Sequence, residues 1–188
     1  MIENKYAMKT YQKLNEAIIP ENFRGKSKII VQLWWIVQST LFALSPQFSY
    51  KWRNLLLKLF GAKIGVGVKI RQSCKITYPW KVCIGDYVRL GDNVELYSLG
   101  EIHIGNHVVI SQSSYLCAGS HDYSKITFDI YQKQITIEDQ VWVAADVFIA
   151  PGVTIGFGSV VGARSTVFND LPAGMICYGN PAVPIRKR

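Results

Sequence analysis

Three histidines are the side chains of this chain best suited to proton transfer at neutral pH, and one of them stands apart. His103 and His107 lie within regular sequence, where we expect exposed or locally bonded imidazoles. His121 follows the segment LCAGS and opens the one long interruption of the repeat described below. An imidazole has a pKa of about 6.5, so it can take a proton from a hydroxyl that attacks an electrophile. His121 is therefore the candidate general base.

The interruption at His121 predicts a loop that leaves a rigid scaffold. The next repeat is expected near residues 122–124 but begins at Ile137, which defines an insertion over 121–136. Loops of this kind commonly carry binding and catalytic groups. Its aromatic and apolar residues predict an arm that covers a cleft or reaches a neighbouring subunit. Asp122, or a backbone carbonyl, is expected to orient the imidazole.

The cysteines predict no disulfide framework and no zinc site. They form no CxxC pair and no Cys/His cluster with metal spacing, which is typical of scattered reduced thiols. Cys117 lies close to His121 in sequence, so a cysteine nucleophile is an alternative to direct transfer. The four residues are Cys74, Cys83, Cys117 and Cys177.

An aliphatic residue recurs every six positions from Ile64 onward, and three units make one group. A small or β-branched residue recurs five positions into most units, with Trp80 as a clear exception. A period of six grouped by three predicts a three-sided coil of about 18 residues, with parallel strands stacked about 4.8 Å apart. The fold class is therefore an all-β solenoid of about five coils. The groups begin at Ile64, Ile84, Ile104, Ile137 and Ile155.

The N-terminal third predicts two helices over 26–44 and 46–60. Ser45-Pro46 is typical of a helix start, and Gly61 of a helix end. The first helix is apolar around most of its circumference, which predicts burial on more than one side. We expect residues 1–63 to cap the first coil of a domain spanning 64–188. A contact of the same segment with a membrane surface is the second interpretation.

The net charge of +8 is concentrated in that third, where residues 1–63 hold ten Lys and Arg against three Asp and Glu. No nucleic-acid motif accompanies it, so no nucleic-acid partner is expected. The apolar run at 29–44 is short for a membrane span, which needs about 20 residues. No signal-peptide pattern is visible in residues 1–11. We expect a cytoplasmic protein that contacts the inner face of the membrane peripherally.

Several segments resemble the hexapeptide-repeat acyltransferases. The superfamily resemblance rests on IGDYVRLGDNV, ITIEDQVWVAADVFIAPGVTIGFGSVVGARSTV and GNPA. Those proteins coil left-handed, against the usual crossover rule. LWWIVQSTLFALSPQ, FGAKIG, ITYPWK, LYSLGEIHIG and ISQSSYLCAGSHDYS are similar to the colanic acid biosynthesis acetyltransferases of the WcaF type. The resemblance implies a left-handed parallel β-helix over residues 64–188.

The resemblance also implies an activity. It points to an O-acetyltransferase that moves an acetyl group from acetyl-CoA to a sugar hydroxyl in exopolysaccharide biosynthesis. His121 matches the general base of the related sugar acetyltransferases, which transfer directly. Those enzymes use an Asn one coil earlier to orient the acceptor; Asn93 is the candidate here, with Ser98 close to the same place. A homotrimer and a sugar or lipid-linked oligosaccharide acceptor are implied in the same way.

Coenzyme A is expected along the last coils. This chain has Phe168-Asn169 where the broader pattern has Thr-Lys, and Val183 where it has Arg, which removes polar help for the nucleotide phosphates. Arg164 and the basic tail are the candidate substitutes. The positions carried over are Trp142, Ala145, Ala163, Arg164, Phe168, Asn169 and Arg186.

Two alternatives use the same fold. A zinc-dependent carbonic anhydrase needs three converging histidines, and this chain has three in total. A non-catalytic scaffold would tolerate the loss of His121. The activated thioester needs no metal, so none is expected.

Overall fold

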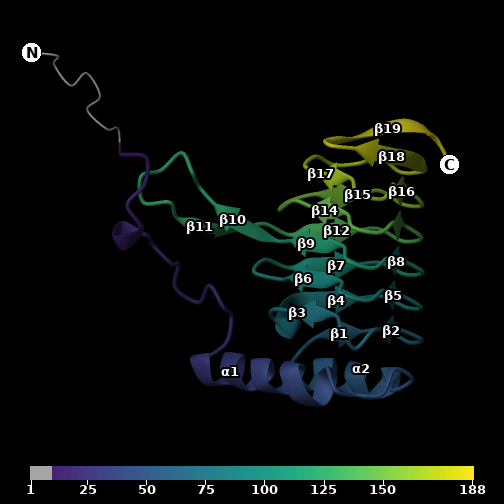
Figure 1. Cartoon of the computed structure of the whole chain (residues 1–188), viewed down its shortest axis with the longest axis horizontal. Coiled ribbons are helices and arrows are strands. Elements are labelled where there is room, and N and C mark those ends of the chain that lie inside the picture. Colours follow the sequence, from purple (N-terminus) through teal and green to yellow (C-terminus); the bar gives the residue numbers. More distant parts are fainter. Residues whose placement is uncertain (1–9) are drawn as a thin grey trace, which may run out of the picture.

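Short strands stack into three sheets, parallel except for a hairpin at the C-terminal end, that run along a solenoid, which stands on two helices (Figure 1). The computed structural model describes residues 10–188. The first nine residues of the expected 1–63 cap, and most of the segment considered for a signal peptide, lie outside the described residues.

Each sheet forms one face of the solenoid. The first face contains β1 (Lys63–Ile64), β4 (Val82–Ile84), β7 (Ile102–Ile104), β12 (Ile135–Ile137) and β15 (Thr154–Ile155). The second contains β2 (Lys69–Ile70), β5 (Arg89–Leu90), β8 (Val109–Ile110), β13 (Trp142–Val143), β16 (Val160–Val161), β18 (Met175–Gly179) and β19 (Ala182–Lys187). The third contains β3 (Lys75–Ile76), β6 (Glu95–Tyr97), β9 (Tyr115–Cys117), β14 (Phe148–Ile149) and β17 (Thr166–Val167).

The six-residue pattern sets the register between coils. Ile84 pairs with Ile104, which pairs with Ile137, which in turn pairs with Ile155. These aliphatic residues point inward and are almost fully buried, so they form the continuous core column that the repeat predicts. Five coils are complete, and β18 together with a bridge from Leu171 to Ile155 begins a sixth. The chain thus forms the left-handed parallel β-helix that the resemblance implied.

Several corners of the solenoid carry large side chains. A left-handed backbone (φ between +20° and +160°) occurs at several corners in large side chains, among them Tyr87, His107, Gln140 and Arg164. Such a φ costs a non-glycine residue energy, so the surrounding hydrogen bonds must hold it. The backbone N–H of Tyr87 donates to Val66 O, and that of His107 to Asp86 O. Coil-to-coil bonds therefore replace the freedom of glycine at these corners.

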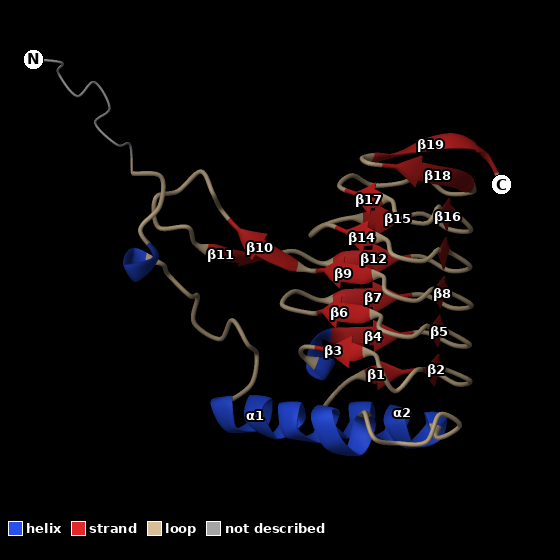
Figure 2. Cartoon of the chain, viewed as in Figure 1, coloured by secondary structure: helices blue, strands red, loops and turns tan. Residues whose placement is uncertain are grey.

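Two helices close the lower end of the solenoid, where strands would otherwise present unpaired edges. They are α1 (Lys28–Val37), which continues into the π-helical turn η2 (Gln38–Phe42), and α2 (Tyr50–Leu59); Figure 2 shows both beneath the strands. Trp34 Nε1 donates to the carbonyl of Ile76 at 2.7 Å, and Gln38 Oε1 accepts its N–H at 2.7 Å. Side chains of the helices thus satisfy the edge of β3.

Arg53 of α2 supplies a hydrogen bond to the exposed edge of β2. Its side chain is fully buried, and Nε donates to Ile70 O at 2.7 Å. The guanidinium also donates to Ser45 Oγ and to two carbonyls of the preceding turn. Burial lowers the pKa of Arg53. Ser45 is therefore a partner of Arg53 and not a helix cap: α2 begins at Tyr50, so the expected start at 46 was wrong.

The first helix is buried on one side only. Val31 and Trp34 face the solenoid and are buried, whereas Ile29, Leu33 and Ile36 are exposed. The expectation of burial on more than one side was therefore wrong for the single chain. Among the described residues, no helix is long and apolar enough to cross a membrane.

A two-stranded arm leaves the solenoid after β9. It consists of β10 (Gly119–His121) and β11 (Ile130–Gln132), which pair antiparallel, and the chain rejoins the solenoid at β12. Figure 1 shows the arm extending away from the coils towards the N-terminal segment, which contains the short 3-10 helix η1 (Leu14–Glu16). Lys13 N donates to Ile126 O at 2.7 Å, and Ile18 N to Asp129 Oδ1 at 3.2 Å. The N-terminal segment therefore straps the tip of the arm.

Candidate active site

His121 lies at the end of β10, directly opposite Ile130 of β11. Its Nδ1 is 2.9 Å from the carbonyl oxygen of Phe128, and its ring stacks on the Phe128 ring with centroids 4.6 Å apart and planes 10° apart. A carbonyl can only accept a hydrogen bond, so Nδ1 carries the proton and Nε2 keeps its lone pair. His121 is exposed. Its Nε2 is thus a basic nitrogen in a fixed direction.

Phe128 holds the imidazole with an unusual backbone. Its φ is 51°, which is rare for a bulky side chain and is commonly kept where function requires it. Phe128 N donates to Lys125 O at 3.0 Å. The adjacent Asp129 accepts from Ile18 N, and hydrogen bonds from Thr127 and Ile18 lower the pKa of its carboxyl. Sequence reasoning missed Phe128 as the orienting residue, because no sequence signal marks a carbonyl seven residues away.

Asp122 adjoins His121 in sequence, but its carboxylate points into the loop. Oδ1 accepts from Ser124 N at 3.0 Å and from Ser124 Oγ at 2.5 Å. These hydrogen bonds hold the pKa of Asp122 below its usual value. Asp122 N donates to Asp129 O at 2.8 Å, so this residue closes the loop. The structure pairs the imidazole with the Phe128 carbonyl and not with Asp122.

A hollow of about 480 Å³ adjoins the imidazole on the arm. Its lining combines aromatic rings with carboxylate, hydroxyl and ammonium groups, a combination that suits a hydroxyl-rich ligand. The lining residues are His121, Asp122, Tyr123, Ser124, Lys125, Asp129, Ile130, Tyr131 and Lys133.

Lys81 ties the root of the arm to the rest of the chain. Its Nζ donates to Phe23 O at 2.6 Å, to Gln132 Oε1 at 2.8 Å and to Leu99 O. These acceptors belong to the N-terminal segment, the arm and the second coil. Burial lowers the pKa of Lys81. Sequence reasoning missed this residue, although Trp80, the exception to the repeat, marks the same turn.

A small second core surrounds that lysine. Ile130, the strand partner of His121, packs against it. Trp80 Nε1 donates to Arg24 O at 2.7 Å and so fixes the N-terminal segment beside it. This core connects α1 to the arm through apolar contact. Its buried members are Phe23, Val31, Tyr78 and Leu99.

Asn93 lies on a different edge of the solenoid from His121. It occupies the corner between β5 and β6 with a φ of 56°, and its N–H donates to Ser73 Oγ at 3.0 Å. The arm leaves from the next corner, after β9. Within one chain the structure does not bring Asn93 to His121. Ser98, the other candidate, is fully buried and bonded to the backbone of Tyr78.

Three of the positions expected to bind coenzyme A meet in one hollow. Ala145, Ala163 and Arg164 line a space of about 390 Å³ at the corner between the second and third faces. Arg164 Nε lies 3.4 Å from Asp146 Oδ2. Trp142 stands on β13 beside this corner, 46% exposed, with Nε1 donating to Ser111 Oγ.

The other three positions lie elsewhere. Phe168 and Asn169 follow β17 on the edge from which the arm departs, and the Phe168 ring is tilted on Phe148 at 6.1 Å. Arg186 lies on β19 opposite Ile176. The structure therefore gathers the small residues and Arg164 but does not join them to Phe168, Asn169 and Arg186 within one chain.

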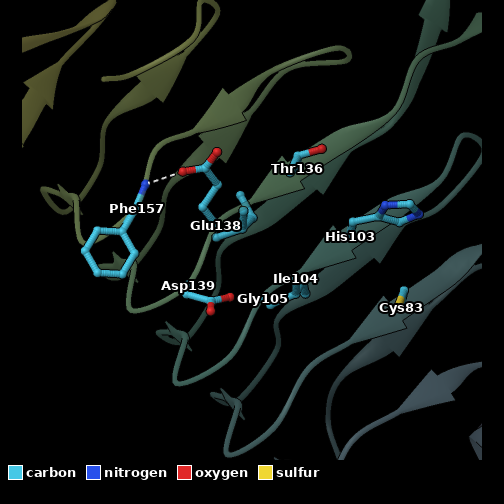
Figure 3. Close-up of a pocket in the computed structure, with 9 residues that line it drawn as sticks. Cys83, His103, Ile104, Gly105, Thr136, Glu138, Asp139 and Phe157 are labelled. Carbon is cyan, nitrogen blue, oxygen red and sulfur yellow. Dashed lines mark hydrogen bonds between the residues drawn. The ribbon is translucent and has the colours of Figure 1, made fainter. Parts of the chain in front are cut away.

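A further hollow of about 430 Å³ lies on the first face (Figure 3). Its polar groups are engaged: Glu138 Oε2 accepts from Phe157 N at 2.6 Å, and Asp139 accepts from Asn106. His103 Nε2 lies 3.0 Å from Glu101 Oε2. The bonds of Glu138 and Asp139 join neighbouring coils, and the contact of His103 stays within one coil, so the hollow presents no uncommitted acid–base pair.

The two remaining histidines are locally bonded, as expected. His103 contacts Glu101 and Gln134, and His107 stacks on Tyr87 with centroids 5.1 Å apart. Within residues 10–188 no group of three His, Cys, Asp or Glu is placed to hold a metal ion. Cys117 Sγ donates to Gly119 O at 3.0 Å. His121 is the histidine whose Nδ1 is bonded to a backbone carbonyl, which leaves Nε2 with its lone pair.

Known proteins similar to this chain are acetyltransferases. The chain is 60% identical over 177 residues to "Putative colanic acid biosynthesis acetyltransferase WcaF" of Escherichia coli K12, covering 94% of the chain and 97% of that protein. It is 32% identical to a galactoside O-acetyltransferase of Lactococcus lactis, covering 71% of the chain and 66% of that protein. No protein-family model matches the chain.

Solved structures agree in fold. A hexapeptide-repeat acetyltransferase from Vibrio cholerae superposes with a TM-score of 0.78 at 28% identity, covering 85% of this chain and 91% of that one. The same Vibrio protein complexed with acetyl coenzyme A gives a TM-score of 0.76 at 27% identity, covering 85% and 87%.

Proposed function

The chain belongs to the hexapeptide-repeat acetyltransferases of the WcaF type, and on that premise we propose that it O-acetylates a sugar of an exopolysaccharide precursor. Acetyl-CoA is the acetyl donor. The acceptor is a sugar or lipid-linked oligosaccharide at the cytoplasmic face of the membrane. The observation that carries the proposal is the imidazole of His121, held by the Phe128 carbonyl so that Nε2 keeps its lone pair.

Transfer runs directly from thioester to alcohol. His121 Nε2 takes the proton of the sugar hydroxyl as its oxygen attacks the thioester carbonyl. The new C–O bond forms a tetrahedral intermediate, whose oxyanion a backbone N–H can stabilise. Collapse breaks the C–S bond, and the imidazolium returns its proton to the departing coenzyme A thiolate. The stack on Phe128 keeps the ring in place throughout. Cys117 is not needed, and its thiol is already bonded to Gly119 O.

The donor would lie in the hollow lined by Ala145 and Ala163. Their small side chains leave room for the narrow pantetheine arm, and Trp142 flanks the same corner. Arg164 and the tail residues Arg186, Lys187 and Arg188 supply positive charge for the nucleotide phosphates. Phe168 and Asn169 would meet the nucleotide end. Asn93 would orient the acceptor.

These groups need a second chain to complete the site. The arm with His121 leaves one edge of the solenoid, whereas the hollow with Ala145 lies on another edge. Asn93 occupies an earlier corner of that second edge. A homotrimer with parallel solenoids would place the arm of one subunit beside the hollow of the next, because a closed ring repeats one heterologous contact. The trimer is therefore part of the proposal.

Replacing His121 by Ala tests the proposed base. We expect transfer from acetyl-CoA to the precursor to fall by about 10²–10⁴-fold, the usual contribution of a general base. The measurement is release of the coenzyme A thiol together with mass spectrometry of the acetylated product. Unchanged turnover by a folded variant would show that His121 is not the base, whereas wild-type protein that releases no thiol would favour a non-catalytic scaffold. A Cys117→Ser variant is the matched control and should retain activity.

A further inference from the structure

The two basal helices carry many exposed apolar side chains. On α1, Ile29, Leu33 and Ile36 recur at helical spacing on the side opposite the buried Val31 and Trp34. A second stripe runs along α2 and the turn before it, and η2 connects the two. Large exposed apolar patches on a folded protein mark a contact surface. We call this surface the basal patch: Ile29, Leu33, Ile36, Leu41, Leu44, Phe48, Trp52, Leu55 and Leu59.

Several side chains of the basal patch are almost fully exposed in the single chain, which is unusual for large apolar residues. Leu44 and Phe48 are 82% and 81% exposed at the turn between the helices. Ile29 and Leu59 are 79% and 71% exposed. Trp52 is partly exposed and donates through Nε1 to Leu41 O, so an amphipathic ring sits among the aliphatic side chains. Tryptophan of this kind is typical of the boundary between water and lipid.

The positive charge around the basal patch indicates which kind of partner fits it. Between Glu21 and Asp86 the chain contains eleven Lys and Arg residues and no Asp or Glu. Lys51 and Lys58 are exposed on α2 itself, and Lys26 and Lys28 lie at the start of α1. A second copy of the same base would bring like charges together. An anionic lipid surface offers both an apolar interior and opposite charge, so it is the occupant that satisfies both features.

We infer that the basal patch docks on an anionic lipid bilayer, with α1, η2 and α2 lying in the headgroup region and the solenoid standing upright on it. Figure 1 shows both helices lying across the solenoid axis, so one plane contains the whole base. No helix of residues 10–188 can span the membrane, which fits an interfacial contact.

This orientation sets the height of the site. The arm departs from the third coil, so two strand spacings of about 4.8 Å and a helix layer of about 10 Å put its root roughly 20 Å above the basal patch. The height matters for catalysis only if the proposed function holds. In that case a lipid-linked acceptor would have to extend from the membrane by that height to reach His121. In a trimer with parallel axes the three basal patches would be coplanar, so their binding would reinforce one another.

Vesicle co-sedimentation of the full-length protein tests the inference. The probes are vesicles of phosphatidylglycerol with phosphatidylethanolamine, and vesicles of phosphatidylcholine alone. Wild-type protein should sediment with the anionic vesicles and be released as salt rises. The double variant Leu44→Glu/Phe48→Glu should lose at least about tenfold in partition. Lys51→Gln and Lys58→Gln should each cost about fivefold on anionic vesicles.

The matched control carries the same two charges at the far end of the solenoid. Phe157→Glu/Ile185→Glu replaces side chains that are 49% and 46% exposed, and it should bind vesicles like wild type. Circular dichroism establishes that both double variants are folded. Wild-type protein left in the supernatant, or equal loss in both double variants, overturns the inference. Thiol release with a water-soluble oligosaccharide acceptor, measured in parallel, reports the proposed activity separately from docking.

Discussion

At the scale of single residues, one hydrogen bond defines the chemistry of the arm. The Phe128 carbonyl accepts from His121 Nδ1, which fixes the tautomer and leaves Nε2 as the base. A carbonyl cannot ionise, so the orientation of the imidazole does not depend on a neighbouring charge. Asp122, the acidic neighbour in sequence, is bonded to Ser124 instead.

Asp122→Asn separates these two ways of orienting the imidazole. An asparagine can still accept from Ser124, and the Phe128 carbonyl is untouched. We therefore expect kcat to stay within about threefold of wild type, far from the loss caused by removing a general base. Steady-state kinetics with acetyl-CoA and the precursor measures this. A loss as large as that of His121→Ala would mean that Asp122, and not the carbonyl, supports the base.

At the scale of elements, the arm is held by contacts far apart in sequence. Lys81 joins the N-terminal segment, the second coil and β11, and the small core around Leu99 packs against Ile130. The strap from Lys13 to Ile18 holds the tip of the arm. The direction of the imidazole is therefore set by elements that the repeat itself does not contain.

Lys81→Met tests this positioning role. Methionine keeps most of the side-chain volume but leaves the acceptors at Phe23, Leu99 and Gln132 without their shared donor. We expect kcat to fall about tenfold with KM for acetyl-CoA unchanged, because a misplaced base lowers the rate without touching the donor hollow. Lys75→Met on the exposed side of β3 is the control. A change in KM for acetyl-CoA, or equal effects of both variants, would contradict a role in the arm.

The solenoid could be predicted from sequence because its register is local and repeated. Each recurring aliphatic residue pairs with the corresponding aliphatic residue one coil away. The pattern of period six is therefore enough to identify Ile84, Ile104 and Ile137 as one column. The arm could be predicted only as an interruption. Within the arm, His121 is bonded to a backbone carbonyl, and every residue has one, so no residue type marks the partner. The left-handed φ of Phe128 is equally invisible in the sequence, because bulky residues rarely adopt it.

The corners of the solenoid and the start of α2 also depend on tertiary contacts that the sequence pattern does not reveal. Large residues adopt left-handed corners because bonds between coils hold them, which periodicity cannot reveal. Ser45-Pro46 has the composition of a helix start, but the buried Arg53 takes Ser45 as a partner and moves the start of α2 to Tyr50. Tertiary contacts overrode a correct local preference in that case.

At the scale of the whole molecule, the groups proposed for catalysis are distributed over separate edges of one prism. The arm projects from the edge after the third face, and the hollow with Ala163 occupies the edge between the second and third faces. The basal patch lies at one end, perpendicular to both. A ring of three upright prisms would therefore form three sites between neighbours and leave one flat underside for lipid.

Mixing two inactive variants tests the central claim, that the imidazole of one subunit acts on acetyl-CoA held by another. His121→Ala removes the base, and Ala163→Trp fills the donor hollow; each alone should form inactive trimers, verified by size-exclusion chromatography. After the two are unfolded and refolded together, random trimers contain intact pairs of arm and hollow, so activity should return to roughly a quarter of the wild-type level. Mixed trimers without activity would contradict a site shared between subunits, and a fully active His121→Ala trimer would contradict the base itself.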